Sequence, residues 1–192
     1  HILFLRSFAD DQVTLPELPF WSRVIRGQNN PSRLDELLVE RFSDVGPVVA
    51  VGRPGEQSLP FGAARIYISG QDWRSRVLDL ASNALAVVIV ADHSPGTAWE
   101  VETMLAHHPQ KTLFLCSPRD LSLDANSFLR AHVGLVQSKG RWLGLHTPGA
   151  EHETLMAKAL TDESYLAAMR VFFGAVLDRQ ERAARGTKQG KR

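Results

Sequence analysis

The acidic and hydroxyl side chains that follow one strongly apolar run carry the most chemistry in this sequence. Residues 85–91 are apolar without interruption, and a short polar turn that contains Ser94 comes next. A helix-start pattern with Glu100 and Glu102 follows the turn. In an open parallel sheet, ligands bind in the crevice at the carboxyl ends of the strands. A carboxylate in the first turns after such a strand is therefore placed to act on a ligand.

Glu100 has two interpretations. Thr97 and Glu100 have the spacing of a capping box, in which each side chain satisfies a backbone N–H at the helix start. Ser94 before Pro95 offers a competing start, with Pro95 at the first helical position. The functional interpretation places Glu100 in the crevice, where it would attack or electrostatically stabilise a sugar carbon as a glycosidic bond breaks. The N–H groups at the helix start would then hold a phosphate.

Residues 92–100, with their G-T-x-x-E core at Gly96, Thr97 and Glu100, resemble the nucleoside 2-deoxyribosyltransferase group. In that group the glutamate of this motif is the nucleophile at the sugar. The resemblance therefore implies that Glu100 is the catalytic carboxylate.

The layout of residues 1–118 also resembles a TIR-type domain. A first strand leads into Asp10 and Asp11, and a later strand leads into a serine, then Trp99, then acids. Enzymatic TIR domains cleave the nicotinamide–ribose bond of NAD⁺ with a glutamate on this helix. In typical TIR domains that glutamate follows the tryptophan by four residues, whereas here the acids follow Trp99 by one and three. This departure favours Glu100 over Glu102.

Polar residues after the first strand and in a later loop are the other site candidates. Arg6, Ser7, Asp10 and Asp11 form either a capped hydrophilic turn or a set of contacts with ribose hydroxyls, for the acids, and phosphate, for Arg6. Arg65 is either a surface arginine or a guanidinium that binds phosphate. We list the candidate substrate-binding residues as Arg6, Ser7, Asp10, Asp11, Arg65, Ser94, Thr97 and Trp99, with Glu100 as the catalytic candidate.

Apolar runs alternate with amphipathic segments along the chain, which predicts an α/β fold. Strands are expected at residues 2–7, 47–52, 85–91, 112–117 and 142–146, and helices at 32–45, 71–84, 95–108 and 162–185. Continuous apolar strands are typical of a sheet that is covered on both faces. We expect a flavodoxin-like three-layer sandwich with a mainly parallel five-stranded sheet in the order 2-1-3-4-5. Residues 1–185 would form one TIR-like domain, and residues 8–31 and 53–70 would be loops at the carboxyl edge.

Composition excludes several classes of protein. The net charge of +1 over 192 residues gives no field for nucleic acid. Residues 179–192 hold six basic groups and one acid, so residues 186–192 are predicted to be a flexible basic tail. Cys116 is the only cysteine, which rules out an internal disulfide and fits a cytoplasmic setting. It lies in an apolar run and is expected to be buried as a small apolar side chain. The seven histidines lack acidic or cysteine partners at ligand spacing, so no metal is expected.

The beginning of the chain suggests a piece of a longer protein, because it opens directly on a strand-like segment. An anchor upstream of His1 or the basic tail would be the only route to a membrane. The sequence has no Gly-x4-Gly-Lys-Ser/Thr loop, no G-x-G-x-x-G and no G-x-S-x-G, which counts against an NTPase, a dehydrogenase and an α/β hydrolase.

Two functions from different classes remain. The first is an enzyme that hydrolyses or transfers an N-glycosidic bond of a nucleotide, with NAD⁺ as the favoured substrate rather than a bound cofactor. The second is a TIR-like module without catalysis, which would self-associate as a homo-oligomer or sense a nucleotide.

Overall fold

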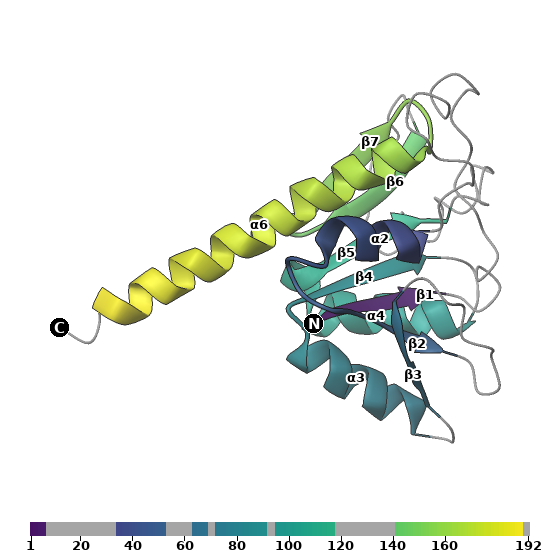
Figure 1. The fold of residues 1–192 in the computed structure, drawn as a ribbon, viewed down its shortest axis with the longest axis horizontal. Helices are drawn as coiled ribbons and strands as arrows, with labels where there is room; N and C mark the ends of the chain where they lie inside the picture. Colours follow the sequence, from purple (N-terminus) through teal and green to yellow (C-terminus); the bar gives the residue numbers. More distant parts are fainter. Residues whose placement is uncertain (7–33, 53–62, 69–71, 92–94, 118–140, 190–192) are drawn as a thin grey trace.

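The computed structural model describes residues 1–6, 34–52, 63–68, 72–91, 95–117 and 141–189. Strands and helices alternate along the first two thirds of the chain, as the apolar pattern predicts (Figure 1). The elements are β1 (Ile2–Arg6), α2 (Leu34–Phe42), β2 (Val48–Gly52), β3 (Ala64–Tyr67), α3 (Trp73–Asn83), β4 (Ala86–Ala91), α4 (Pro95–His107), the 3-10 turn η2 (Pro109–Lys111), β5 (Thr112–Cys116), β6 (Arg141–His146), β7 (Glu153–Ala157) and α6 (Asp162–Gln189).

The described strands form one mixed sheet of seven strands in the order β3-β2-β1-β4-β5-β6-β7. The four pairings from β3 to β5 are parallel, whereas β6 pairs antiparallel with both β5 and β7. The prediction of five strands is wrong in number. The five predicted strands do occupy neighbouring positions in the predicted order, and β3 and β7 extend the sheet at its two edges.

One physical property explains why β3 and β7 could not be predicted: both are edge strands. An edge strand has a neighbour on one side only and does not need the continuous apolar run of a central strand. All four residues of β3 are exposed or half-buried, and the same holds for the five residues of β7. In contrast, β4 and β5 are buried along their whole length.

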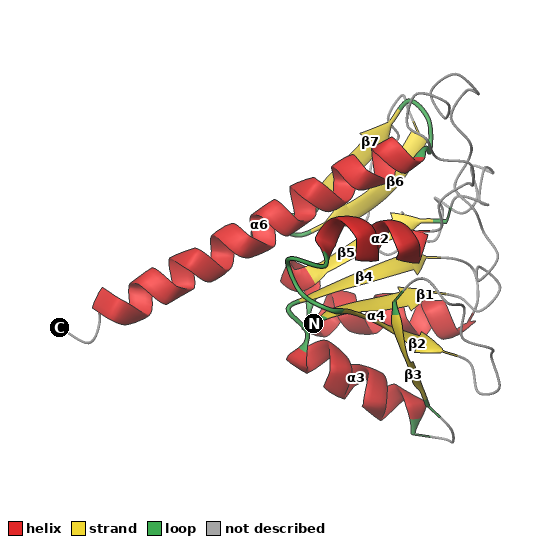
Figure 2. Cartoon of the chain, in the orientation of Figure 1, coloured by secondary structure: helices red, strands yellow, loops and turns green. Residues whose placement is uncertain are grey.

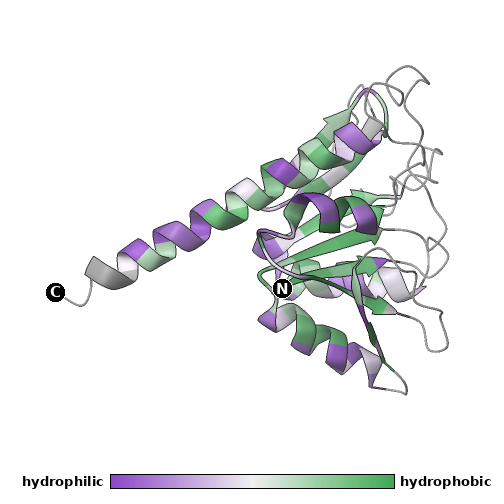
Figure 3. Cartoon of the chain, in the orientation of Figure 1, coloured by the Kyte–Doolittle hydropathy of each residue, from purple (hydrophilic) through white to green (hydrophobic). Residues whose placement is uncertain are grey.

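Helices cover both faces of the sheet (Figure 2). Alternate residues of β1 and β4 face two separate hydrophobic clusters, one shared with α2 and α6 and the other shared with α3 and α4. Figure 3 shows the most hydrophobic residues gathered on the central strands. This burial supplies the main favourable term in folding.

The first half of α6 docks against the sheet through Tyr165, Met169, Phe172 and Phe173, each of which is at most 1% exposed. The hydroxyl of Tyr165 donates a 2.7 Å hydrogen bond to the carbonyl oxygen of Cys116, at the end of β5. Cys116 itself is buried, as predicted.

The second half of α6 extends beyond the sheet (Figure 1). A helix of 28 residues is about 42 Å long, which is much longer than the strands that it covers. The helix runs to Gln189, four residues past the predicted end at Arg185, and so takes in part of the predicted basic tail. The flexibility of residues 186–192 stays a prediction. Of the helices that the structure describes, none is long and apolar enough to cross a membrane.

Candidate active site at the carboxyl edge of the sheet

The strand order places a topological switch point between β1 and β4. From β1 the chain passes through β2 to β3 in one direction, and it then returns to form β4 on the other side of β1. Arg6, the last residue of β1, is paired in register with Val90 near the end of β4. Open α/β sheets bind ligands outside the carboxyl ends of the strands at such a point. The segments that follow β1 and β4 therefore define the candidate site.

Glu100 lies in the second turn of α4, because this helix begins at Pro95. Thr97 is therefore a helical residue rather than the cap. The buried residues of α4 are Thr97, Glu100, Val101 and Met104, which recur at the spacing of one helical face. This face meets the sheet.

The two acids of α4 have different environments. The side chain of Glu100 is 8% exposed and shares the sheet-facing side of the helix with Thr97. Glu102 is exposed to solvent. A carboxylate in a partly desolvated position interacts more strongly with a positive charge than an exposed one does. The structure therefore gives Glu100 and Glu102 different environments, and the catalytic role of Glu100 stays a prediction.

The side chain of Trp99 on α4 packs against the beginning of α3. Its ring meets the ring of Trp73 edge to face, with centroids 4.9 Å apart and planes at 74°. The guanidinium carbon of Arg74 lies 5.3 Å from the centroid of Trp99 and 5.7 Å from that of Trp73. Each of these contacts stabilises the packing of α3 against α4. The sequence pattern gave no sign of Arg74.

Arg6 and Arg65 converge on one carboxylate, that of Asp35 in the first turn of α2. Asp35 Oδ2 lies 3.9 Å from Arg6 Nη1 and 3.7 Å from Arg65 Nη2. The exposed fractions of the three side chains are 8% for Arg6, 6% for Arg65 and 1% for Asp35. The two predicted arginines are thus brought together although 59 positions of sequence separate them. We refer to these three residues as the Asp35 cluster.

Sequence reasoning missed Asp35, because an acid in the first turn of a helix is usually a solvated residue that complements the helix dipole. Its position one residue after Leu34 and three before Leu38, at helical spacing with the apolar face of the predicted helix, was the available signal. Both leucines are buried on the same helix, so the first turn of α2 is drawn against the sheet with them.

The Asp35 cluster and Glu100 approach the switch point from opposite faces of the sheet. Ile2 and Phe4 of β1 belong to the hydrophobic cluster shared with α2, so alternation directs Arg6 to that face. Glu100 lies on α4, which covers the other face. A ligand that contacts both must therefore lie across the ends of β1 and β4, over the edge of the sheet.

Four predicted site residues, Ser7, Asp10, Asp11 and Ser94, lie outside the described residues. Within the ranges that the structure describes, no three His, Cys, Asp or Glu side chains form a group that could hold a metal ion.

Comparison of the chain with protein-family models, curated proteins and solved structures finds no match.

Proposed function

We propose that this chain hydrolyses or transfers the N-glycosidic bond of a nucleotide, with NAD⁺ as the favoured substrate and Glu100 as the catalytic carboxylate. The observation that carries the proposal is the position of Glu100: nearly buried, on the sheet-facing side of α4, directly after the central strand β4 at the switch point. A flavodoxin-like sandwich is part of the same proposal, with β3 and β7 extending the five predicted strands at the two edges of the sheet.

The chemistry needs one well-placed negative charge. When the bond between ribose C1′ and the nicotinamide nitrogen of NAD⁺ breaks, the electron pair goes to the ring nitrogen, and nicotinamide leaves as a neutral molecule. The positive charge moves to the sugar, where a carboxylate stabilises it or attacks C1′ directly. Water then adds at C1′ and releases a proton. Nicotinamide becomes neutral when it departs, so no general acid is needed to protonate it. One ionised carboxylate, such as that of Glu100, is therefore sufficient.

Arg6 has a positioning role in this scheme. It ends β1, beside the switch point, and Asp35 holds its guanidinium at 3.9 Å. The planar guanidinium of an arginine matches the geometry of a phosphate, so Arg6 is proposed to contact the substrate phosphate. Ser7, Asp10 and Asp11 follow Arg6 in the chain and are proposed to contact ribose, while Trp99 forms a wall of the site.

A specific observation favours a second candidate, a nucleotide-sensing or self-associating module without catalysis. Several proposed substrate contacts already take part in internal interactions. Arg6 and Arg65 pair with Asp35, and the ring of Trp99 packs against Trp73 and Arg74. Such contacts stabilise a fold whether or not a ligand is present.

Product analysis separates the two candidates. The purified chain is incubated with NAD⁺ and, in parallel, with 2′-deoxynucleosides, and the free base is measured by chromatography. The enzyme predicts release of nicotinamide or of a nucleobase. A chain that releases no base but is stabilised by a nucleotide in thermal unfolding would be a sensing module, because ligands that bind the native state raise Tm. Absence of both effects would contradict the enzyme and the nucleotide-sensing module, and would leave self-association as the remaining alternative.

A further inference from the structure

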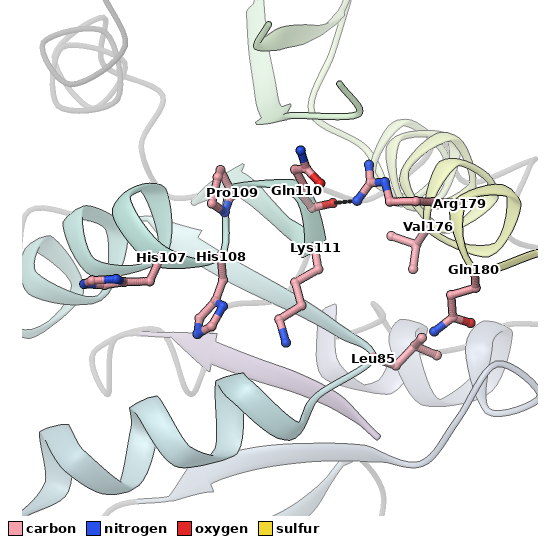
Figure 4. A pocket seen from close by; sticks show the side chains of 9 residues that line it. All are labelled: Leu85, His107, His108, Pro109, Gln110, Lys111, Val176, Arg179 and Gln180. Carbon is pink, nitrogen blue, oxygen red and sulfur yellow. Dashed lines mark hydrogen bonds between the residues drawn. The ribbon is translucent and has the colours of Figure 1, made fainter. Parts of the chain in front are cut away.

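A cavity of about 490 Å³ lies at the opposite edge of the sheet from Glu100, where β4 and β5 begin. The end of α4, the turn η2 and the middle of α6 enclose it (Figure 4). Its volume falls within the range of small-molecule sites, which is about 300–1,000 Å³. Leu85 and Val176 supply an apolar part of the lining.

The polar lining of this cavity is basic. His107, His108, Lys111 and Arg179 all line it, and none of the described lining residues carries a carboxylate. Figure 4 shows the side chains of His108 and Lys111 extending in the same direction from the turn η2. Two permanent cations, Lys111 and Arg179, and two imidazoles thus line the same cavity.

Backbone carbonyl groups fix the two permanent cations. Lys111 Nζ donates hydrogen bonds to the carbonyl oxygens of Ser82, at 2.9 Å, and Ala84, at 3.1 Å. Arg179 donates to the carbonyl oxygens of Gln110 and of Pro148, the latter at 2.7 Å. An ammonium has three donors and a guanidinium five, so both side chains keep N–H groups for a ligand. Fixed side chains lose little conformational entropy when a ligand binds.

Burial disfavours the charged forms of His108 and Lys111 in this cavity. Burial lowers the pKa of His108 below its ordinary value, and the charges of Lys111 and His107 lower it further. Burial also lowers the pKa of Lys111. The hydroxyl of Ser82 lies 3.4 Å from Nε2 of His108, and Arg179 lines the same cavity. An anion would reverse both effects, since it attracts the protonated forms.

We propose that this cavity binds the phosphoryl group of a small molecule through Lys111 and Arg179. The planar guanidinium and the point charge of the ammonium are the two side-chain groups that proteins use most for phosphate. Leu85 and Val176 are placed to contact the remainder of the ligand. The site is separate from Glu100 and does not depend on the proposed catalysis.

Calorimetric titration tests the site, with inorganic phosphate and AMP as probes at constant ionic strength. We expect saturable binding of both probes to the unmodified chain. Tighter binding of AMP than of phosphate supports a nucleotide site, and equal affinities support a site for the phosphoryl group alone. No saturable binding of either probe would overturn the proposal.

Two variants locate the binding. Lys111→Gln removes a lining cation and should weaken binding of phosphate about tenfold or more. Arg182→Gln removes the same charge from an exposed position on α6, three residues after Arg179, and should change the affinity by about twofold or less. Unchanged affinity in Lys111→Gln, or equal losses in both variants, would place the anion elsewhere and overturn the site.

The unmodified chain gives a readout that does not depend on how the variants fold. Linkage is reciprocal, so an anion that binds more tightly when His108 is protonated must raise the pKa of His108. Titration of the histidine ring signals by NMR, with and without phosphate, measures this change. An upward shift for His108 supports the proposal, and an unshifted His108 contradicts it.

Discussion

Replacement of Asp35 by asparagine should strongly destabilise the fold. The substitution keeps the shape of the side chain and removes its charge, so two nearly buried guanidinium groups lose this carboxylate. Each pair, at 3.7 and 3.9 Å, corresponds to about 4 kcal/mol of Coulomb attraction at an effective dielectric constant of about 20. Repulsion between Arg6 and Arg65 and the cost of desolvation offset part of this sum. Removing one partner of a buried ion pair costs about 3–5 kcal/mol.

Urea unfolding followed by circular dichroism measures this loss. Domains of this size have a free energy of unfolding of about 5–15 kcal/mol, and 1 kcal/mol shifts Tm by about 2–4 °C. We therefore expect Asp35→Asn to lower Tm by about 6–20 °C.

The control for Asp35 is Asp79, which pairs with Arg76 at the shorter distance of 2.8 Å. Both side chains of that pair are 54% exposed, and exposed pairs contribute about 0–1 kcal/mol. Asp79→Asn should thus change stability by less than about 1 kcal/mol. Equal effects of the two substitutions would refute the argument that burial, rather than distance, makes the Asp35 cluster important.

Further substitutions test the packing of the sheet and the pH dependence of the stability of the fold. Gly144→Ala should destabilise by about 1–3 kcal/mol in urea, because a Cβ there would overlap the carbonyl oxygen of Phe114, whereas Gly174→Ala, with no atom within 4 Å, should not destabilise. His146 is 2% exposed, and burial lowers its pKa against the opposing effect of Glu153, so the native state favours the neutral ring. The unfolded chain takes up a proton near pH 6.5, so stability should fall from about pH 7 to 5, and His146→Gln should reduce this slope. An identical slope in that variant would contradict the assignment.

The centre of the fold could be predicted from the sequence, because its strands are buried on both faces. A run such as residues 86–91 has no polar side chain and must lie between two layers of helices. The order of the central strands follows from the preference for right-handed crossovers between parallel strands. The edges could not be predicted in the same way. β3 and β7 are short and half-exposed, so neither has the long, fully buried apolar run that marks a central strand.

The candidate site shows a similar division. The position of Glu100 could be predicted, because the helix that carries it follows the central strand directly and Pro95 marks its start. The Asp35 cluster depends on pairing between β2 and β3 and on the docking of α2, which join residues far apart in the sequence. No local pattern contains that information. Arg6 and Arg65 were singled out for phosphate, and their contact with Asp35 appears only in three dimensions.

The rate of nicotinamide release from NAD⁺ by two matched variants tests the proposed function most directly. Glu100→Gln and Glu102→Gln remove the same charge from the same helix, one from the buried face and one from the exposed face. If the proposal is correct, Glu100→Gln lowers the rate by about 10³-fold or more at unchanged Tm, and Glu102→Gln leaves it within about twofold. Equal rates in the two variants, or no release by the unmodified chain, would contradict a catalytic role for Glu100.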